Sequence, residues 1–390
     1  MRIMIRNGIV VTQDSGRRVL NTNVLIDGNT IESVGSASDK SDFLIDAHGS
    51  VVMPGLINMH THVGMTSLRG MVDCSSLKVF LEQTSEFDRH NTKEMIKKST
   101  ELAAEEMISS GTTSFLDLYY SEDVIAAVAS KAGLRSFLSW VVLDKEYTTQ
   151  KGTPIRNAES FVKRYKGKGP VTPSFGLQGV YVCSKETIRN TIALAEKYNT
   201  LVHMHLSETK EEVSGCVEKN KLRPIEFMHK NRFLSKRTIA AHCVWANNDE
   251  MGALSKSHAT AVNNAISNAR LGSGTADIRK MLGKRINVAL GTDSAASNDS
   301  LDMFQTMKFS ALVNGLTAQQ ALDMATVNAA MALQSEIGSI EKGKLADIII
   351  LDGAAIKPTN KKNAVSNVVF AAHGRNVTTS IIGGKIVRQK

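Results

Sequence analysis

Short apolar runs, separated by polar and turn residues, occupy both ends of the chain, and this pattern is typical of β-strands. Near the N-terminus the predicted strands cover residues 3–12, 22–26, 30–34, 43–45 and 51–53. Asp27-Gly28 is a strong hairpin signal between two of them. The C-terminus repeats the pattern over residues 346–352, 365–371 and 377–387, with a tight turn at Gly383-Gly384. Neither segment alone has enough surface to bury, so we predict that residues 1–53 and 341–390 form one small β-sandwich.

Between these segments the pattern changes to short apolar runs that alternate with amphipathic helical stretches. Eight strands are predicted, over residues 55–59, 113–118, 135–143, 172–178, 201–206, 238–243, 259–263 and 286–290. Helix signals lie between them: a helix over 92–110 before Gly111, an N-cap at Ser184, and a capping box from Thr317 to Gln320 before a helix that runs to Leu333. Eight such units in residues 54–340 predict an α/β fold, a (β/α)8 TIM-like barrel with its chemistry at the C-terminal strand ends.

The amino-acid composition indicates a soluble globular protein. Hydrophobic residues make up 42% and charged residues 22%, as in soluble globular proteins. No window approaches the roughly 18 apolar residues of a membrane span. The N-terminal apolar run is broken at Arg6 and Asn7 and lacks a cleavage site, so it predicts a strand and not a signal peptide. We therefore expect a cytoplasmic protein with no membrane partner.

The distribution of charge and the spacing of the cysteines argue against a nucleic-acid-binding protein and against a protein with a thiolate zinc site. The net charge of +9 comes from 47 basic and 38 acidic residues, but these are scattered without interleaved aromatic residues, so we expect no nucleic-acid partner. The basic surface is expected to help an anionic or electron-rich substrate approach. The cysteines, which we expect to be reduced and mostly buried, contain no Cys-x-x-Cys pair, which argues against a thiolate zinc cluster and against the cysteine-ligated zinc deaminases. They are Cys74, Cys183, Cys216 and Cys243.

The candidate chemistry lies at the ends of four predicted strands. His60-Thr-His62 ends the first, and residues i and i+2 of a strand point to one side, so both imidazoles can reach one cation. His203 and His205 end the fifth strand and also share a side, so the spacing alone leaves two candidate ligands there. The sixth and eighth strands end at His242 and Asp293. Three imidazoles and a carboxylate suit a divalent first-row metal with one position open for water.

These segments resemble the amidohydrolase superfamily, in particular the subgroup of S-adenosylhomocysteine and methylthioadenosine deaminases and triazine chlorohydrolases. The resemblance rests on residues 53–62, 65–70, 205–209, 240–244, 267–272 and 291–298. It implies that one Zn²⁺, or alternatively Fe²⁺, is bound by His60, His62, His205 and Asp293. The family pattern places the fifth-strand ligand three residues before Glu208, which favours His205 over His203. Binuclear relatives need a lysine at the end of strand four, and residues 177–180 contain none, so the resemblance implies a single metal.

The resemblance also implies a mechanism. The cation lowers the pKa of its water from about 15.7 toward roughly 7, which supplies a metal-bound hydroxide at neutral pH. Asp293 accepts the proton, and His242 orients the nucleophile. Glu208 protonates the ring nitrogen beside the attacked carbon, and the amine leaves as ammonia. The implied activity is hydrolytic deamination of a nitrogen heterocycle that is purine-like or adenosine-like, by a hydrolase acting on the carbon–nitrogen bonds of cyclic amidines.

Several positions depart from the adenosine-type pattern. Gln178 stands where such members carry a substrate-holding histidine, and residues 263–265 replace a usual His-Asn-Pro. Trp140 stands where some relatives have an arginine, and the nearest candidate for a ribose-binding glutamate is Glu86. We therefore expect Glu86, Trp140 and Gln178 to contact a small heterocyclic substrate whose identity stays open.

Two alternatives remain beside deamination. In the first, chloride or another group leaves a triazine-like ring. In the second, the barrel is non-catalytic and binds a ligand, which would predict a missing metal ligand, and the sequence lacks none. Assembly into a homo-oligomer is implied by the resemblance alone.

Overall fold

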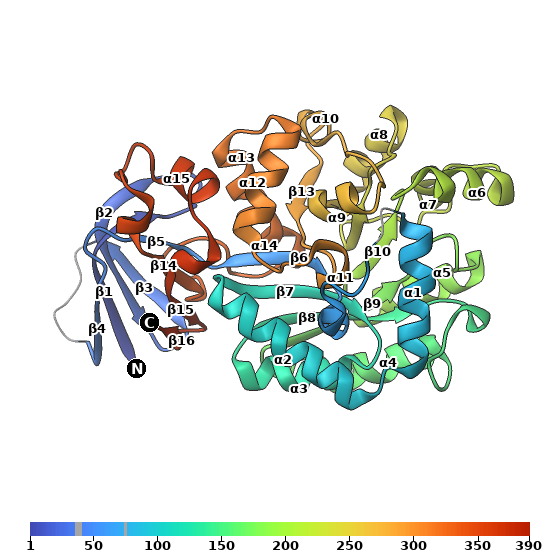
Figure 1. The fold of residues 1–390 in the computed structure, drawn as a ribbon, viewed down its shortest axis with the longest axis horizontal. Helices are drawn as coiled ribbons and strands as arrows, with labels where there is room; N and C mark the ends of the chain where they lie inside the picture. Colours follow the sequence, from blue (N-terminus) through green and yellow to red (C-terminus); the bar gives the residue numbers. More distant parts are fainter. Residues whose placement is uncertain (36–40, 74–75) are drawn as a thin grey trace.

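The computed structural model describes residues 1–35, 41–73 and 76–390, and these form two parts (Figure 1). One part is a barrel of parallel strands wrapped by helices, and the other is a mixed sheet that contains both chain termini. The eight parallel strands neighbour one another in chain order, which confirms the predicted barrel. They are β6 (Leu56–Thr61), β7 (Thr112–Tyr119), β8 (Arg135–Val142), β9 (Val171–Leu177), β10 (Val202–Leu206), β11 (Thr238–His242), β12 (Thr260–Asn263) and β13 (Asn287–Leu290).

The strands of the barrel are buried on both sides, and their buried residues include polar as well as apolar side chains. Every residue of β6, β7, β10 and β11 is buried. The ring closes where the chain beyond β13 returns to β6, because the backbone N–H of Asp293 donates to the carbonyl of His60 at 2.9 Å. Closure therefore places the segment after the last strand directly beside the end of the first.

Helices follow the strands around the outside of the barrel (Figure 1). Their predicted caps are present: Thr92, Ser184 and Thr317 accept hydrogen bonds from the backbone N–H groups of the first turns of α2, α5 and α13. The helices are α1 (Leu77–His90), α2 (Lys93–Ser109), α3 (Glu122–Ala132), α4 (Pro154–Tyr165), α5 (Lys185–Tyr198), α6 (Lys210–Asn220), α7 (Pro224–Lys230), α8 (Asn248–Ser257), α9 (Ala265–Arg270), α10 (Ile278–Gly283), α11 (Ala295–Asn298), α12 (Met303–Asn314), α13 (Ala318–Met324), α14 (Val327–Leu333) and α15 (Ala364–Phe370).

The single helix expected from Thr317 to Leu333 is wrong, because the chain breaks between α13 and α14. Thr326 at the break has φ −134° and ψ −93°, outside the helical region. Its hydroxyl donates to the carbonyl of Leu322 at 2.6 Å and accepts from the side-chain amide of Gln13 at 2.9 Å. A contact with the N-terminal segment, more than 300 residues away, therefore interrupts a helix that local periodicity predicts as continuous.

Both ends of the chain contribute to one mixed sheet, as predicted. Its strand order is β16-β15-β14-β5-β1-β2-β3, and β4 pairs with the first half of β1. The two predicted layers are joined by hydrogen bonds between β5 and β14, so the sandwich is a single folded sheet around one apolar core. Its strands are β1 (Arg2–Val11), β2 (Val19–Asp27), β3 (Thr30–Gly35), β4 (Phe43–Asp46), β5 (Val51–Pro54), β14 (Ile348–Leu351), β15 (Val377–Ile382) and β16 (Lys385–Gln389).

The strand predicted over residues 365–371 is wrong, because this segment forms α15. Its β-branched residues favour a strand. However, Ala364, Val368 and Val369 are buried at helical spacing, and the helix packs against α12 and α13. Tertiary packing thus overrides the local preference.

Gly55 is the only residue between β5 of the folded sheet and β6 of the barrel. A Cβ atom there would lie 2.1 Å from the Oγ1 atom of Thr113, so the close approach of this junction to β7 requires glycine. The folded sheet is therefore continuous with the first strand of the barrel. The domain boundaries at residues 53/54 and 340/341 stay predictions.

Cys183, Cys216 and Cys243 are buried and free, as expected, and Cys74 lies outside the described residues. Within residues 1–35, 41–73 and 76–390, none of the helices combines the length and the apolar character needed to cross a membrane.

Candidate metal centre and pocket

The structure brings together the side chains that the sequence places at separate strand ends. His60 lies in β6 and His62 follows this strand directly, whereas His205 lies in β10. His242 ends β11, and Asp293 lies three residues beyond β13. All of these residues are at the C-terminal end of the barrel, where the parallel strands converge.

Four of these side chains form the ligand cluster, which we define as His60, His62, His205 and Asp293. The Nε2 atom of His62 lies 3.2 Å from the Nε2 atom of His205 and 3.2 Å from Oδ1 of Asp293. The Nε2 atom of His60 lies 3.4 Å from the same Oδ1 atom. Candidate ligand atoms of His60, His62 and His205 all lie within 4.8 Å of one another, and so do those of His60, His242 and Asp293.

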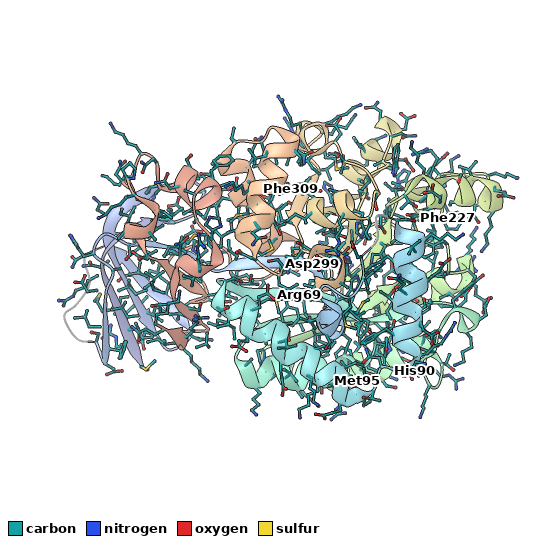
Figure 2. All side chains as sticks on the ribbon, in the orientation of Figure 1. Arg69, His90, Met95, Phe227, Asp299 and Phe309 are labelled. Atoms are coloured by element: carbon teal, nitrogen blue, oxygen red, sulfur yellow. The ribbon has the colours of Figure 1, made fainter. Side chains whose placement is uncertain are left out.

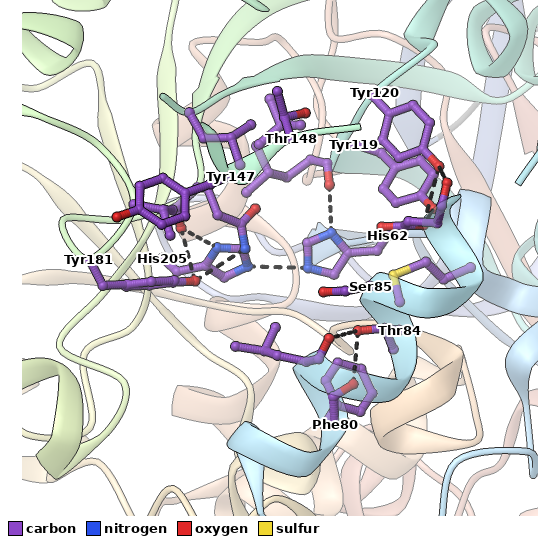
Figure 3. A pocket seen from close by; sticks show the side chains of 18 of the residues that line it. His62, Phe80, Thr84, Ser85, Tyr119, Tyr120, Tyr147, Thr148, Tyr181 and His205 are labelled. Carbon is purple, nitrogen blue, oxygen red and sulfur yellow. Dashed lines mark hydrogen bonds between the residues drawn. The ribbon is translucent and has the colours of Figure 1, made fainter. Parts of the chain in front are cut away.

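The orientation of the rings tests whether a cation fits this cluster. The Nδ1 atoms of His62 and His205 lie 2.5 Å and 2.7 Å from the carbonyl oxygens of Leu118 and Gln178, so in a neutral ring each Nδ1–H donates outward. Both Nε2 atoms then carry lone pairs that face each other (Figure 3). Ligand atoms around tetrahedral zinc, with bonds of about 2.0–2.1 Å, lie roughly 3.3 Å apart. The spacing and donor chemistry of the cluster therefore fit one divalent cation.

Burial and mutual charge set the protonation of the cluster. Burial, together with the neighbouring imidazoles of His62 and His242, holds the pKa of His205 well below its usual value. Burial alone would raise the pKa of Asp293, but His60 and His62 hold it well below its usual range. The shifts of His205 and Asp293 favour a neutral imidazole and an ionised carboxylate, the forms that bind metals, whereas Asp293 raises the pKa of His62 against the opposing effect of burial.

Residues beyond strand β12, not assigned a role in the sequence analysis, hold Asp293 and His242. The hydroxyl of Ser267 donates to Oδ2 of Asp293 at 2.6 Å, while the N–H of Ser294 donates to Oδ1 at 2.8 Å. The side-chain oxygen of Asn268 lies 2.7 Å from Nδ1 of His242. Ser267 and Asn268 belong to a segment that carries the resemblance, and this was the signal available in the sequence.

Glu208 lies beside His242, with 3.7 Å between its Oε2 atom and Nε2 of the imidazole. Its other carboxylate oxygen accepts from the hydroxyl of Ser273 at 3.1 Å. Glu212 holds the turn, because its carboxylate accepts from the N–H groups of Ser207 and Glu208 at 3.0 Å and 2.7 Å. Burial raises the pKa of Glu208, so its carboxyl group keeps a proton to a higher pH than an exposed glutamate does.

The rival ligand His203 lies on the far side of His60 from the cluster. Its Nε2 atom is 2.8 Å from Nδ1 of His60, and the residue is fully buried. His203 thus contacts a candidate ligand and belongs to neither of the two groups of potential metal ligands.

A cavity of about 490 Å³ opens above the cluster, within the size range of small-molecule sites. His62, His205, His242, Glu208 and Asp293 line it together with three wall segments. Figure 3 shows Phe80, Thr84 and Ser85 of α1 on one side, Tyr119 and Tyr120 at the end of β7, and Tyr147 and Thr148 of the loop after β8.

Of the residues expected to contact substrate, Gln178 lines the cavity, and its side-chain amide donates to the hydroxyl of Tyr181 at 3.1 Å. The cavity-lining residues of the described chain do not include Trp140. Its indole N–H donates to Oε1 of Gln150 at 2.8 Å, and its ring packs against Phe161. The structure thus places Gln150 in the cavity wall and Trp140 behind it, and contact of Trp140 with substrate stays a prediction.

Glu86 also lies outside the residues that line the cavity, and its contact with substrate stays a prediction. Its carboxylate is 59% exposed and pairs with Arg89 and His90 on the outer side of α1. Figure 2 shows His90 at the molecular surface at the end of this helix. The acidic residue of α1 that lines the cavity is Asp88, whose Oδ1 accepts from the hydroxyls of Tyr119 and Tyr120 at 2.5 Å and 3.2 Å.

Similar proteins share this fold across almost the whole chain. The 5-methylthioadenosine/S-adenosylhomocysteine deaminase of Thermococcus sibiricus is 36% identical, over 99% of this chain and 94% of the relative. The 5'-deoxyadenosine deaminase of Methanothermobacter thermautotrophicus is also 36% identical, over 93% of this chain and 88% of the relative. The crystal structure of an adenosine deaminase from Xanthomonas campestris with bound zinc superposes with a TM-score of 0.93 at 27% identity, over 99% of this chain and 93% of that one.

A sequence model described as the Amidohydrolase family matches residues 51–387. This match spans the end of the folded sheet, the whole barrel and most of the C-terminal strands. It confirms the resemblance seen in the strand-end motifs and the prediction of a hydrolase. The chain belongs to the amidohydrolase family.

Proposed function

We propose that the chain is a metal-dependent aminohydrolase that removes an amino group from a purine nucleoside or a related nitrogen heterocycle and releases ammonia. The observation that carries this proposal is the position of Glu208, which lies beside His242 at the base of the cavity and next to the ligand cluster. An acid at this place can protonate a ring nitrogen, which deamination of an aromatic amidine requires. The deaminase relatives support the same reaction.

The proposed ligands of the metal are His60, His62, His205 and Asp293. Zn²⁺ suits this nitrogen and oxygen donor set best and is bound in the similar Xanthomonas structure, with Fe²⁺ as the alternative. When bound, a single cation supplies Lewis acidity that activates water at neutral pH.

In this proposal the protein groups move the protons. Asp293 accepts a proton from the attacking water. Hydrogen bonds from Ser267 and Ser294 hold its carboxylate in place for this step. His242, held by Asn268, orients the water against the ring carbon. Glu208 gives its proton to the neighbouring ring nitrogen as the water oxygen bonds to the ring carbon. The amine then takes the proton that Asp293 removed from the water, the C–N bond breaks and ammonia leaves, and the remaining hydroxyl proton returns to Glu208 as the carbonyl group of the product forms. Burial raises the pKa of Glu208, which favours the acid form that this step needs.

The walls of the cavity suggest how the rest of the substrate is held. We propose that Asp88 takes the role expected of Glu86 and accepts hydrogen bonds from substrate hydroxyl groups. Both tyrosine hydroxyls that contact Asp88 donate to its Oδ1 atom, and the carboxylate lines the cavity, where it can also accept from a ligand. Gln178 and Gln150 are proposed to hydrogen-bond the heterocycle from the opposite wall.

The test is a screen for ammonia release from adenosine, 5'-deoxyadenosine, methylthioadenosine, S-adenosylhomocysteine, guanine, pterins and triazines, with metal content measured on the same preparation. We expect ammonia from at least one purine, and a loss of about 10²- to 10⁴-fold in the E208Q variant. E86Q is the matched control, because Glu86 is an exposed glutamate outside the cavity. Undiminished turnover in E208Q would contradict the role of Glu208.

Release of another leaving group, such as chloride from a triazine-like ring, is the second candidate. The observation that favours it is Gln178, which replaces the histidine of adenosine-type relatives at the cavity wall. Chloride and ammonia measured side by side on chlorinated and aminated triazines separate the two reactions. A cytoplasmic location and assembly into homo-oligomers stay predictions.

A further inference from the structure

His203 has a second contact in addition to His60, and it leads away from the cavity through the interior of the barrel. The Nδ1 atom of His203 lies 3.4 Å from the hydroxyl oxygen of Ser139 on β8. This hydroxyl lies 2.7 Å from that of Ser174 on β9. Ser174 in turn lies within hydrogen-bond distance, 3.3 Å, of the carbonyl oxygen of Leu138. We call His60, His203, Ser139 and Ser174 the polar chain, and all four are at most 1% exposed.

The polar chain ends at a carbonyl oxygen, which can only accept a hydrogen bond. Each hydroxyl and imidazole group of the polar chain is therefore expected to donate toward this end. If Ser174 donates its single hydroxyl proton to Leu138, it must accept from Ser139. Ser139 has then used its proton and accepts from Nδ1–H of His203. A neutral His203 consequently has a bare Nε2 atom, which accepts from Nδ1–H of His60. The remaining nitrogen of His60, Nε2, is left with a lone pair directed at the ligand cluster.

The opposite direction is less favourable. It would place a proton on Nε2 of His60, and this buried atom has no hydrogen-bond partner of acceptable geometry among the described residues, although Oδ1 of Asp293 lies 3.4 Å away. A buried N–H without a partner is costly, whereas a buried lone pair at this position is what a cation needs. The polar chain and the orphaned nitrogen therefore favour the same tautomer of His60.

We propose that His203, Ser139 and Ser174 are positioning residues that hold His60 in the tautomer that binds metal. This inference rests on the metal centre proposed above. It gives a role to His203, the histidine of the fifth barrel strand that is not a proposed ligand. Metal-bound histidines usually donate their second ring N–H to a carboxylate or a carbonyl group, and here the imidazole of His203, whose other nitrogen faces the hydroxyl of Ser139, takes that place.

The test measures Zn²⁺ affinity by chelator competition, and the visible spectrum of the Co²⁺-substituted protein, in wild type and variants. We expect H203L to lower Zn²⁺ affinity about 10- to 100-fold and to change the Co²⁺ spectrum. H203Q should recover most of the affinity, because an amide can accept from His60 and donate to Ser139. S174A should lower affinity by a smaller factor, and S136A serves as the matched control, since the Ser136 hydroxyl is buried on β8 without a hydrogen-bond partner among the described residues.

The outcomes separate this inference from the proposed function. A wild-type protein that binds no metal would overturn the proposed metal centre and the inference with it. Wild-type Zn²⁺ affinity in H203L would overturn the inference alone. If H203L does not fold, S174A and H203Q carry the test. Equal losses of affinity in S174A and S136A would overturn it too, because they would reveal a general effect of packing.

Discussion

The ligand cluster and the α1 wall of the cavity both line the same site, but the first is built on strands and the second on a helix, so side chains two residues apart are directed differently in the two regions. In the cluster, alternate residues of a strand share one face, so His60 and His62 must point to the same side. In α1, residues two apart are about 200° apart around the axis, so Glu86 and Asp88 point to opposite sides. Proximity in sequence is therefore a safe guide to a site on a strand and a poor one on a helix.

The largest effect should come from the cluster itself. D293N removes a proposed ligand and the proposed proton acceptor at once, so we expect turnover to fall on the order of 10⁴-fold, with loss of bound metal. Metal analysis and ammonia assays on the same preparation measure both losses. Full metal content together with normal turnover would show that the convergence at the strand ends is not the working centre.

The need for a protonated Glu208 should appear in the pH profile as a limb on the alkaline side, where activity falls. Glu208 must be protonated to act, and burial raises its pKa, so activity should persist above the pH at which an exposed glutamate ionises and fall as pH rises through the raised pKa. E208Q should lose activity about 10²- to 10⁴-fold and lose this limb. A limb that persists unchanged in E208Q would assign it to another group.

The two carboxylates of α1 provide the direct comparison on the wall. D88N should raise KM about tenfold for substrates that carry hydroxyl groups, because a charge-assisted hydrogen bond is weakened, with less change in kcat. E86Q, two residues away on the solvent side, should match wild type. Equal effects of the two substitutions would erase the distinction between the faces of the helix.

The smallest effect is expected behind the wall. W140F removes the hydrogen bond from the indole to Gln150 and keeps most of the packing against Phe161, so we expect a loss of about 1 kcal/mol in stability and less than a threefold change in kcat/KM. Thermal unfolding and substrate kinetics measure the two. A change in KM like that of D88N would return Trp140 to the substrate-contacting residues.

The sequence predicted what depends on local spacing. All eight barrel strands, three helix caps and the strand-end histidines were predictable, because apolar runs and capping residues act over a few positions. The break at Thr326 and the helix at 364–370 were not, since each depends on contacts with distant segments. Likewise, Asp88 and Gln150 are identified by the walls that α1 and the loop after β8 build around the cavity.

Gly55 has a mechanical consequence. It joins β5, which is hydrogen-bonded between β1 and β14, to β6, which carries His60. A force applied to either strand passes along one extended backbone into the other. Removing the last strands of the polypeptide would take away the support of β5 on the flank of β14 and leave β1 as its remaining partner. The described strands at the two ends of the chain thus support β5, and through it β6, although none of their residues lines the cavity.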